Sequence, residues 1–216
     1  EMGRKRVAVQ QLIAAYRNVG NRWANLDPLK RTERPDIPEL NPSFYGFSDG
    51  DMDIVFNTSN TFFGKNNMTL RDLLQALRET YCGTLTAEFM YIADQKIKKW
   101  WQEKLESIRS TPKFTNEQRR QILDRVTAAE GLERYLQAKY VGQKRFSLEG
   151  GDSFIPCMDE LIQGAGKKGV QEIVIGMAHR GRLNVLVNVL GKSPKDLFAE
   201  FDHTAQEDLP AGDVKY

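Results

Sequence analysis

The stretch IVIGMAHRGRLN at residues 173–184 does most to decide the fold. A β-branched run leads into a turn that brings His179, Arg180 and Arg182 together. β-Branched side chains favour strands, and ligands of open parallel sheets bind beyond the carboxyl ends of the strands. The stretch therefore predicts a strand over residues 172–176 that ends at a ligand site.

A second strand is predicted upstream, over residues 145–149, and the turn Gly150-Gly151-Asp152 follows it. A helix from about residue 153 to residue 165 would join the two strands. Such a strand–helix–strand unit is parallel and right-handed. Because two strands cannot form a parallel sheet that is covered on both faces, residues 141–216 are interpreted as the incomplete beginning of an α/β domain.

Residues 1–140 are predicted to form a helical region. Apolar side chains recur there at helical spacing, and Thr69 and Thr115 are followed three residues later by Asp72 and Gln118, as in capped helix starts. The predicted helices cover residues 5–18, a segment from Thr69, residues 86–107 and residues 115–140.

A proline-rich strap at about residues 27–51 interrupts this helical region. Four prolines between residues 28 and 42 preclude a regular helix. The segment nevertheless carries many apolar side chains, so it is predicted to pack against the helices as irregular structure. The expected anchors are Leu26, Leu29, Ile37, Leu40, Phe44, Tyr45 and Phe47.

The composition excludes several classes of protein. A net charge of +2 argues against a nucleic-acid binder, and no apolar run reaches the ~20 residues that cross a bilayer. Cys82 and Cys157 form no C-x-x-C pair and are expected to be reduced, buried thiols. No cluster of histidine, cysteine and acidic residues has metal-ligand spacing, so no metal site is predicted.

The candidate site combines an imidazole with two guanidinium groups. Arginine offers forked donors to carboxylates and phosphates, and histidine exchanges protons near neutral pH. Gly181 would let the backbone approach an anion closely. The alternative is an ordinary loop whose arginines pair with surface acids. For Gly150-Gly151-Asp152, likewise, a tight turn with an aspartate cap is the alternative to a phosphate cradle.

Several segments resemble one known family, the thiamine-diphosphate-dependent first component of the 2-oxoglutarate dehydrogenase complex. The segments FSLEGGD and GMAHRGRLNVLVNVLG carry most of the resemblance. The matching segments are residues 26–29, 80–83, 127–136, 146–152 and 176–191.

The resemblance implies a homodimeric enzyme of the bacterial cytoplasm or the mitochondrial matrix. It would decarboxylate 2-oxoglutarate and pass the succinyl group to the lipoyl-bearing succinyltransferase component. His179 would be a catalytic and substrate-binding residue, and Arg180 would bind the cofactor or the substrate. The family's ligands for Mg²⁺ have no match here, so the chain is interpreted as an amino-terminal portion that is inactive alone.

Two other interpretations remain open at this point. A related enzyme acting on 2-oxoadipate would carry the same motifs. A helical interaction module without catalysis would explain residues 1–140, but it gives no purpose to the residues around His179. The chain also departs from the family locally, with Asn18-Val-Gly-Asn21 where the family often has Arg-Gly-His.

Overall fold

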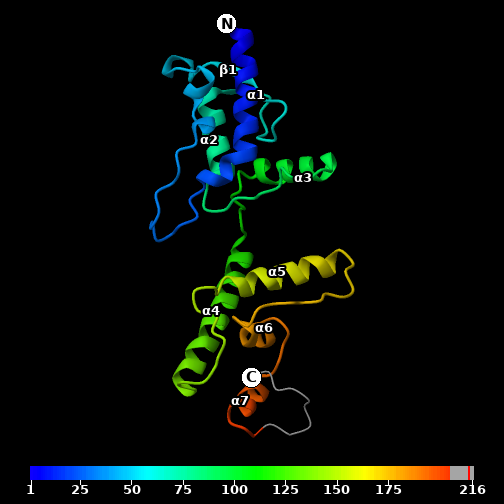
Figure 1. Ribbon diagram of the computed structural model, residues 1–216. Helices are drawn as coiled ribbons and strands as arrows, with labels where there is room; N and C mark the ends of the chain where they lie inside the picture. Colours follow the sequence, from blue (N-terminus) through cyan, green and yellow to red (C-terminus); the bar gives the residue numbers. More distant parts are fainter. Residues whose placement is uncertain (205–213, 215–216) are drawn as a thin grey trace. The chain divides into compact units, whose positions relative to one another are not determined.

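Helices dominate the part of the chain that the computed structural model describes, residues 1–204 and residue 214 (Figure 1). The α-helices in this part are α1 (Met2–Val19), α2 (Leu70–Tyr81), α3 (Gln95–Ser107), α4 (Asn116–Lys139), α5 (Phe154–Lys167), α6 (Arg182–Asn188) and α7 (Pro194–Phe201). Between α1 and α2 lie the 3-10 helices η1 (Gly20–Trp23), η2 (Pro38–Leu40), η3 (Pro42–Tyr45) and η4 (Asp49–Asp51). They are followed by the strands β1 (Val55–Asn57) and β2 (Asn67–Thr69).

These elements form two compact units, residues 1–113 and residues 114–216. The division differs from the predicted change at residue 140. Helix α4 falls in the second unit because Ala129, Leu132 and Leu136 pack with side chains of α5, α6 and α7. The first unit, with α1, α2 and α3, has the helical character predicted for the amino-terminal region.

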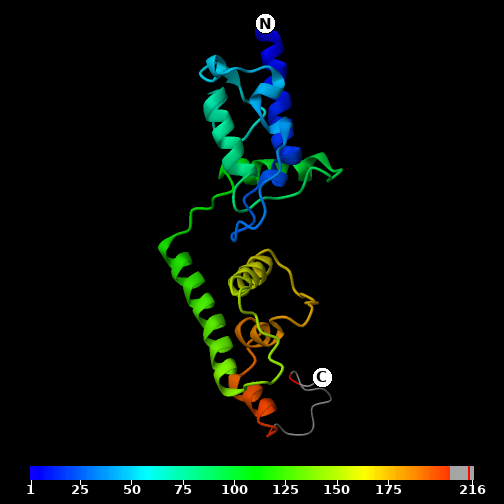
Figure 2. The same ribbon diagram turned by 60° about the vertical axis from the view of Figure 1, so that its left-hand side comes forward.

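The core of the first unit lies between α1 and α2, which run side by side (Figure 2). Apolar residues recur every three or four positions on both helices, so each helix buries one face. Ile13, Leu73 and Leu77 are at most 1% exposed. The predicted cap of α2 is confirmed, since the hydroxyl of Thr69 accepts the backbone N–H of Asp72 at 3.1 Å.

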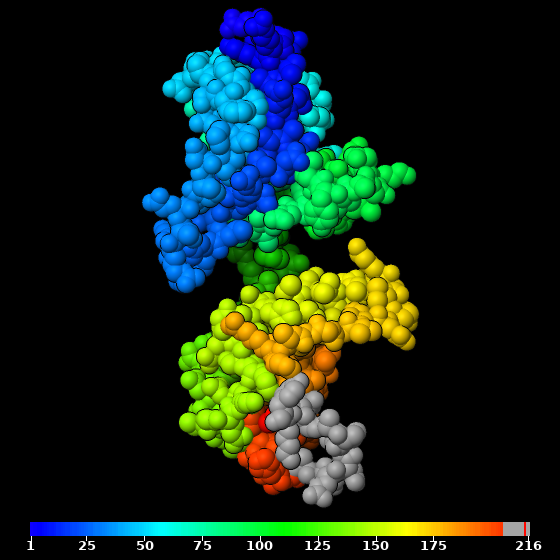
Figure 3. All heavy atoms as spheres, in the orientation of Figure 1, coloured from blue at the N-terminus to red at the C-terminus, as the bar shows by residue number. Residues whose placement is uncertain are grey.

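The strap packs along α1, and Figure 3 shows its mid-blue atoms against the dark blue of that helix. Its prolines allow short 3-10 turns in place of a regular helix. Ile37, Leu40 and Phe47 are buried, and the hydroxyl of Tyr16 donates to the carbonyl oxygen of Leu40 at 3.0 Å. The expected anchors that are exposed instead are Leu26, Leu29 and Phe44.

A buried carboxylate joins the parts of the first unit. Glu106 of α3 accepts hydrogen bonds from Arg17 of α1 at 2.8 and 3.1 Å, and from the hydroxyl of Tyr81 at 2.6 Å. The backbone N–H of Phe62 donates to it at 2.8 Å. Burial, together with the negative charge of Glu106, raises the pKa of Tyr81. A buried charge with this many donors is satisfied, as burial requires.

Helix α3 begins later than the predicted start at Thr86. The side chain of Asp94 accepts the backbone N–H groups of Lys96 and Ile97 at 2.7 and 3.2 Å, so it caps the helix and fixes Gln95 as the first residue. Ile97, in the first turn of this helix, is 49% exposed and so lies outside the buried face.

Helix α4 organises the second unit. Its predicted capping box is confirmed: the hydroxyl of Thr115 accepts the N–H of Gln118 at 3.2 Å, and the Gln118 side chain accepts the N–H of Thr115 at 2.9 Å. Gly131 does not interrupt the helix, which continues to Lys139. Its buried face therefore supports the segments on both sides of α5.

The two predicted strands, residues 145–149 and 172–176, are irregular segments without strand pairing. The described residues contain one ladder, the antiparallel pair β1–β2, so the predicted parallel unit is not formed within them. Backbone groups of the segment at residues 145–149 form hydrogen bonds with partners outside any sheet. The carbonyl oxygen of Phe146 accepts the N–H of Gly181, and the N–H of Leu148 donates to Glu133.

Candidate functional site

The turn of residues 179–182 rests on the segment of residues 146–150, just before α6 begins. The N–H of Gly181 donates to the carbonyl oxygen of Phe146 at 2.6 Å. One terminal nitrogen of the Arg180 guanidinium donates to the carbonyl oxygen of Glu149 at 2.5 Å. The two stretches that the sequence analysis singled out are therefore adjacent, although Glu149 and Arg180 are 31 positions apart in the sequence.

The ring of Phe146 contacts two side chains of the turn, His179 and Arg182. The rings of Phe146 and His179 have centroids 5.6 Å apart and are tilted by 43°. The central carbon of the Arg182 guanidinium lies 4.4 Å from the centroid of the Phe146 ring, within the range of a cation–π interaction. His179 and Arg180 are exposed, whereas Arg182 is half-buried. An imidazole and a guanidinium thus reach solvent at the same loop.

Two glycines permit this approach. Gly181 has φ +77°, and a β-carbon there would lie 2.5 Å from a methyl carbon of Leu148, which is closer than atoms can pack. Gly150 has φ +83°, and a β-carbon there would lie 3.6 Å from the guanidinium of Arg180. Both positions favour glycine because L-residues avoid this backbone region. At Gly150 the backbone conformation favours glycine, whereas at Gly181 the close approach of Leu148 also requires it.

Buried polar side chains hold the two stretches on α4. One carboxylate oxygen of Glu133 accepts the N–H of Leu148 at 3.0 Å and the side-chain amide of Asn184 at 3.1 Å. The same amide donates to the carbonyl oxygen of Ala129 at 2.9 Å. Glu133 is 2% exposed and Asn184 is fully buried. Neither they nor Phe146 were predicted as site residues, because contacts across such sequence distances leave no local pattern.

The site is chemically suited to an anion. Arginine carries five N–H donors, and the exposed guanidinium of Arg180 uses one of them on Glu149. With Arg182 and His179 beside it, the corner offers positive charge and a group that transfers protons at neutral pH. Among residues 1–204 and 214, no group of three or more histidine, cysteine or acidic side chains could hold a metal ion.

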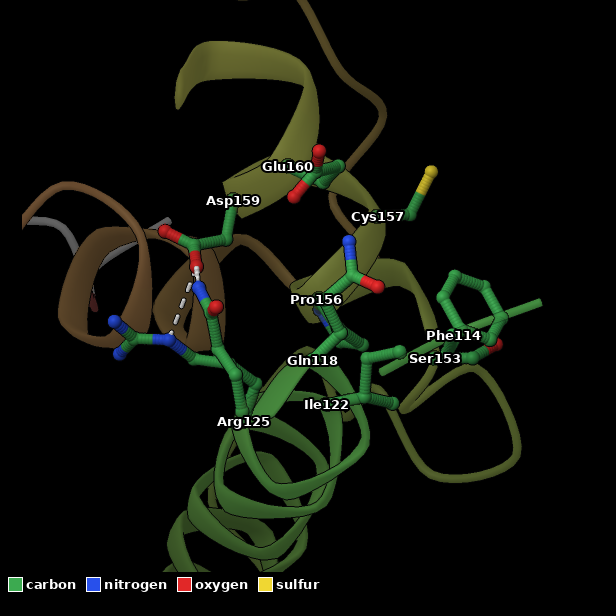
Figure 4. A pocket seen from close by; sticks show the side chains of 10 residues that line it. Phe114, Gln118, Ile122, Arg125, Ser153, Pro156, Cys157, Asp159 and Glu160 are labelled. Atoms are coloured by element: carbon green, nitrogen blue, oxygen red, sulfur yellow. Dashed lines mark hydrogen bonds and ion pairs between the residues drawn. The ribbon is translucent and has the colours of Figure 1, made fainter. Parts of the chain in front are cut away.

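A separate cavity of about 380 Å³ lies between α4 and α5 (Figure 4). Its apolar lining includes Phe114, Ile122 and Pro156, and at one side Arg125 pairs with Asp159 at 3.2 Å. The lining also includes Cys157, whose side chain is exposed. The prediction that both thiols are buried therefore holds for Cys82 alone, whose pKa burial raises to about 11. No helix in the described part of the chain is long and apolar enough to cross a membrane.

Comparison with known proteins extends the resemblance to the whole chain, although no family model matches. All 216 residues align at 72% identity with the 2-oxoglutarate dehydrogenase E1 component of Cupriavidus necator, and at 49% with the protein of that name from Azotobacter vinelandii. The one from Haemophilus influenzae is 49% identical over 99% of the chain. The chain spans about 23% of the length of each of these relatives. The predicted resemblance is thus confirmed for a part of such proteins.

Proposed function

We propose that the chain is the amino-terminal part of a 2-oxoglutarate dehydrogenase E1 component, which decarboxylates 2-oxoglutarate and transfers the succinyl group to a lipoyl arm. The observation that carries this proposal is 72% identity over every residue of the chain to a protein of that name. The cationic corner at residues 179–182 supplies the chemistry that a dianionic 2-oxo acid requires. Because the chain spans under a quarter of its relatives, we expect it to be inactive alone.

The described residues fit a phosphorylated cofactor at this corner. The guanidinium of Arg180 is exposed and uses one of its donors on Glu149, so other donors are available to a diphosphate oxygen. Thiamine diphosphate, when bound, supplies the nucleophilic carbon and the electron sink for decarboxylation. We propose that the Mg²⁺ that accompanies a diphosphate is held by ligands outside this chain, since the described residues contain no group of three or more histidine, cysteine or acidic side chains that could hold it.

We assign the roles at the site as follows. Arg180 binds an anionic oxygen of the cofactor or the substrate, because its planar donors match such groups. His179 donates or accepts a proton at the oxygen of the substrate's keto group, and its imidazole neutralises the charge that develops there. Its exposure leaves it accessible to a substrate.

The segment of residues 172–176 would complete the predicted parallel sheet. Ile173 and Val174 are 44% and 97% exposed, although β-branched side chains of this kind normally line a sheet. We propose that strands from the remainder of the polypeptide pair with this segment. The same larger assembly, a homodimer in the bacterial cytoplasm bound to the succinyltransferase component, would provide the complete active site.

The test is turnover by the complete polypeptide with thiamine diphosphate and Mg²⁺, using 2-oxoglutarate and 2-oxoadipate in parallel. We expect 2-oxoglutarate to be the better substrate. His179→Ala should reduce kcat ~10²-fold or more, within the range of a general acid–base group. The matched control is His203→Ala, since His203 is the other exposed histidine. Equal turnover by the two variants would remove His179 from the mechanism, and no turnover by the wild type would defeat the proposed function.

A further inference from the structure

Phe146 stands out among the residues of the candidate site because its backbone is strained. Its φ is +50°, in the left-handed region that residues with a β-carbon rarely occupy. A glycine would adopt this conformation without that penalty. Residues held in such regions persist where surrounding contacts over-determine them, and they concentrate at functional sites. The contacts of Phe146 therefore indicate what its conformation serves.

The side chain of Phe146 packs against the core formed by α4, α6 and α7, and it also contacts the turn of residues 179–182. The carbonyl oxygen of Phe146 accepts the N–H of Gly181 at 2.6 Å, which fixes the backbone of the turn. Its ring lies 5.6 Å from the imidazole of His179, between ring centroids, and 4.4 Å from the guanidinium carbon of Arg182. One residue thus contacts the backbone of the turn, the imidazole of His179 and the guanidinium of Arg182.

The left-handed conformation allows this double contact. The N–H of Leu148, two residues further on, is anchored to the buried carboxylate of Glu133. The turn itself is anchored by Asn184 on the same carboxylate. Between these fixed points, the backbone at Phe146 directs its carbonyl oxygen to Gly181 while its half-buried ring remains beside His179.

We propose that Phe146 is a positioning residue that orients the imidazole of His179 for the reaction and holds the guanidinium of Arg182 beside it. The proposal rests on the proposed function of this site. An aromatic face holds a cation and an imidazole through its electrons, whereas an aliphatic side chain of similar volume fills the space without that attraction. Misplacement of a reacting group by about 1 Å can cost on the order of 10²-fold in rate.

The first experiment compares Phe146→Leu with Phe146→Tyr in the complete polypeptide. We expect Phe146→Leu to lower kcat on the order of 10-fold to 10²-fold, because the orienting face is lost. Phe146→Tyr keeps the aromatic face of the ring and should therefore retain most of the wild-type activity. If the leucine variant matches the wild type, or the tyrosine variant is as impaired as the leucine variant, the ring does not orient the site.

A second pair of variants separates orientation from stability. Phe146→Ala and Phe146→Gly both remove the ring, but glycine relieves the strained φ. The glycine variant should therefore unfold at a higher denaturant concentration than the alanine variant, while the two have equally reduced kcat. If the glycine variant has both a higher unfolding midpoint and a higher kcat than the alanine variant, Phe146 serves stability alone.

A third readout does not depend on turnover. The 216-residue chain has only two histidines, so their imidazole protons give separable NMR signals. Loss of the Phe146 ring current in Phe146→Leu should move the signals of His179 and leave those of His203 in place. Unchanged His179 signals would overturn the proposal. If these signals move but the wild-type polypeptide turns over no 2-oxo acid, the orienting contact stands and the proposed function fails.

Discussion

A single ion pair fixes the first turns of α1 to the end of the strap. The ammonium of Lys5 donates to Asp51 at 2.6 Å, and the other carboxylate oxygen accepts the N–H and hydroxyl of Ser48 at 2.9 and 3.0 Å. The hydrogen bond from Lys5 is the main cause that lowers the pKa of Asp51 from 3.8 to about 2. A lowered pKa means that folding favours the ionised form.

This pKa predicts an acid-sensitive contribution to stability. The unfolded state binds a proton at Asp51 more readily than the folded state, so the contribution is complete above pH 4 and disappears as the pH falls towards 2. Denaturant unfolding of Asp51→Asn, followed from pH 5 to pH 2, should therefore depend less on pH than that of the wild type. The control is Asp53→Asn, whose partner Arg71 is exposed, and its pH dependence should parallel the wild type.

At the scale of elements, α4 acts as the support for the site. Glu133 accepts hydrogen bonds from the backbone of Leu148 and from the amide of Asn184. Helix α4 therefore fixes the positions of the segment before α5 and of α6. Its second carboxylate oxygen is buried without a hydrogen-bond partner in the described part of the chain. Such an arrangement is costly to disturb, because the donors would be left buried and unsatisfied.

Glu133→Leu should accordingly destabilise the second unit by about 2 kcal/mol or more, the cost of leaving buried N–H groups unpaired. Glu133→Gln keeps a carbonyl acceptor for both donors and should cost less. Glu130→Gln is the control on the same helix, because Glu130 forms an exposed pair with Arg134. Urea unfolding monitored by circular dichroism measures all three. Equal stability of the leucine and wild-type proteins would contradict the supporting role of Glu133.

The sequence predicted those elements whose signals are local. Periodic apolar residues and the caps at Thr69 and Thr115 located α2 and α4. The predicted start of α3 was too early, because the apolar pattern continues on the amino-terminal side of the cap at Asp94. The β1–β2 pair was missed, since its three-residue strands depend on pairing such as Phe56 with Met68 across a loop. The predicted strand at residues 145–149 failed because its backbone groups serve the turn near Gly181.

The motifs of the candidate site could be predicted from the sequence, but the residues that hold them in place could not. The run His179-Arg180-Gly181 predicted a site at the turn, and in the structure this turn lies beside Gly150. The role of Phe146 depends on a backbone conformation that no local pattern indicates. Hydrogen bonds from α4 reach the site across many positions of sequence, and only the folded chain reveals them.

At the scale of the molecule, each unit has its own buried core and so can unfold cooperatively by itself. The tryptophans offer a way to follow one unit alone. All three, Trp23, Trp100 and Trp101, belong to residues 1–113, whereas helices of both units contribute to circular dichroism.

We therefore predict that the two probes respond to different substitutions. Glu106→Gln, which weakens the buried network around Arg17, should lower the denaturant midpoint seen by tryptophan fluorescence. Glu133→Leu should leave that midpoint unchanged and lower a transition seen by circular dichroism. Coincident shifts of both probes in both variants would mean that the units unfold as one.

The exposed segment at residues 172–176 affects the tendency of the polypeptide to self-associate. A row of β-branched side chains with unpaired backbone is a template for self-association into fibrils or amorphous precipitate. Val174, with 97% of its surface bare, lies in the middle of that row. During synthesis the ribosome releases this segment before the strands that we propose cover it. Chains in which this segment stays uncovered are therefore expected to associate with one another more readily.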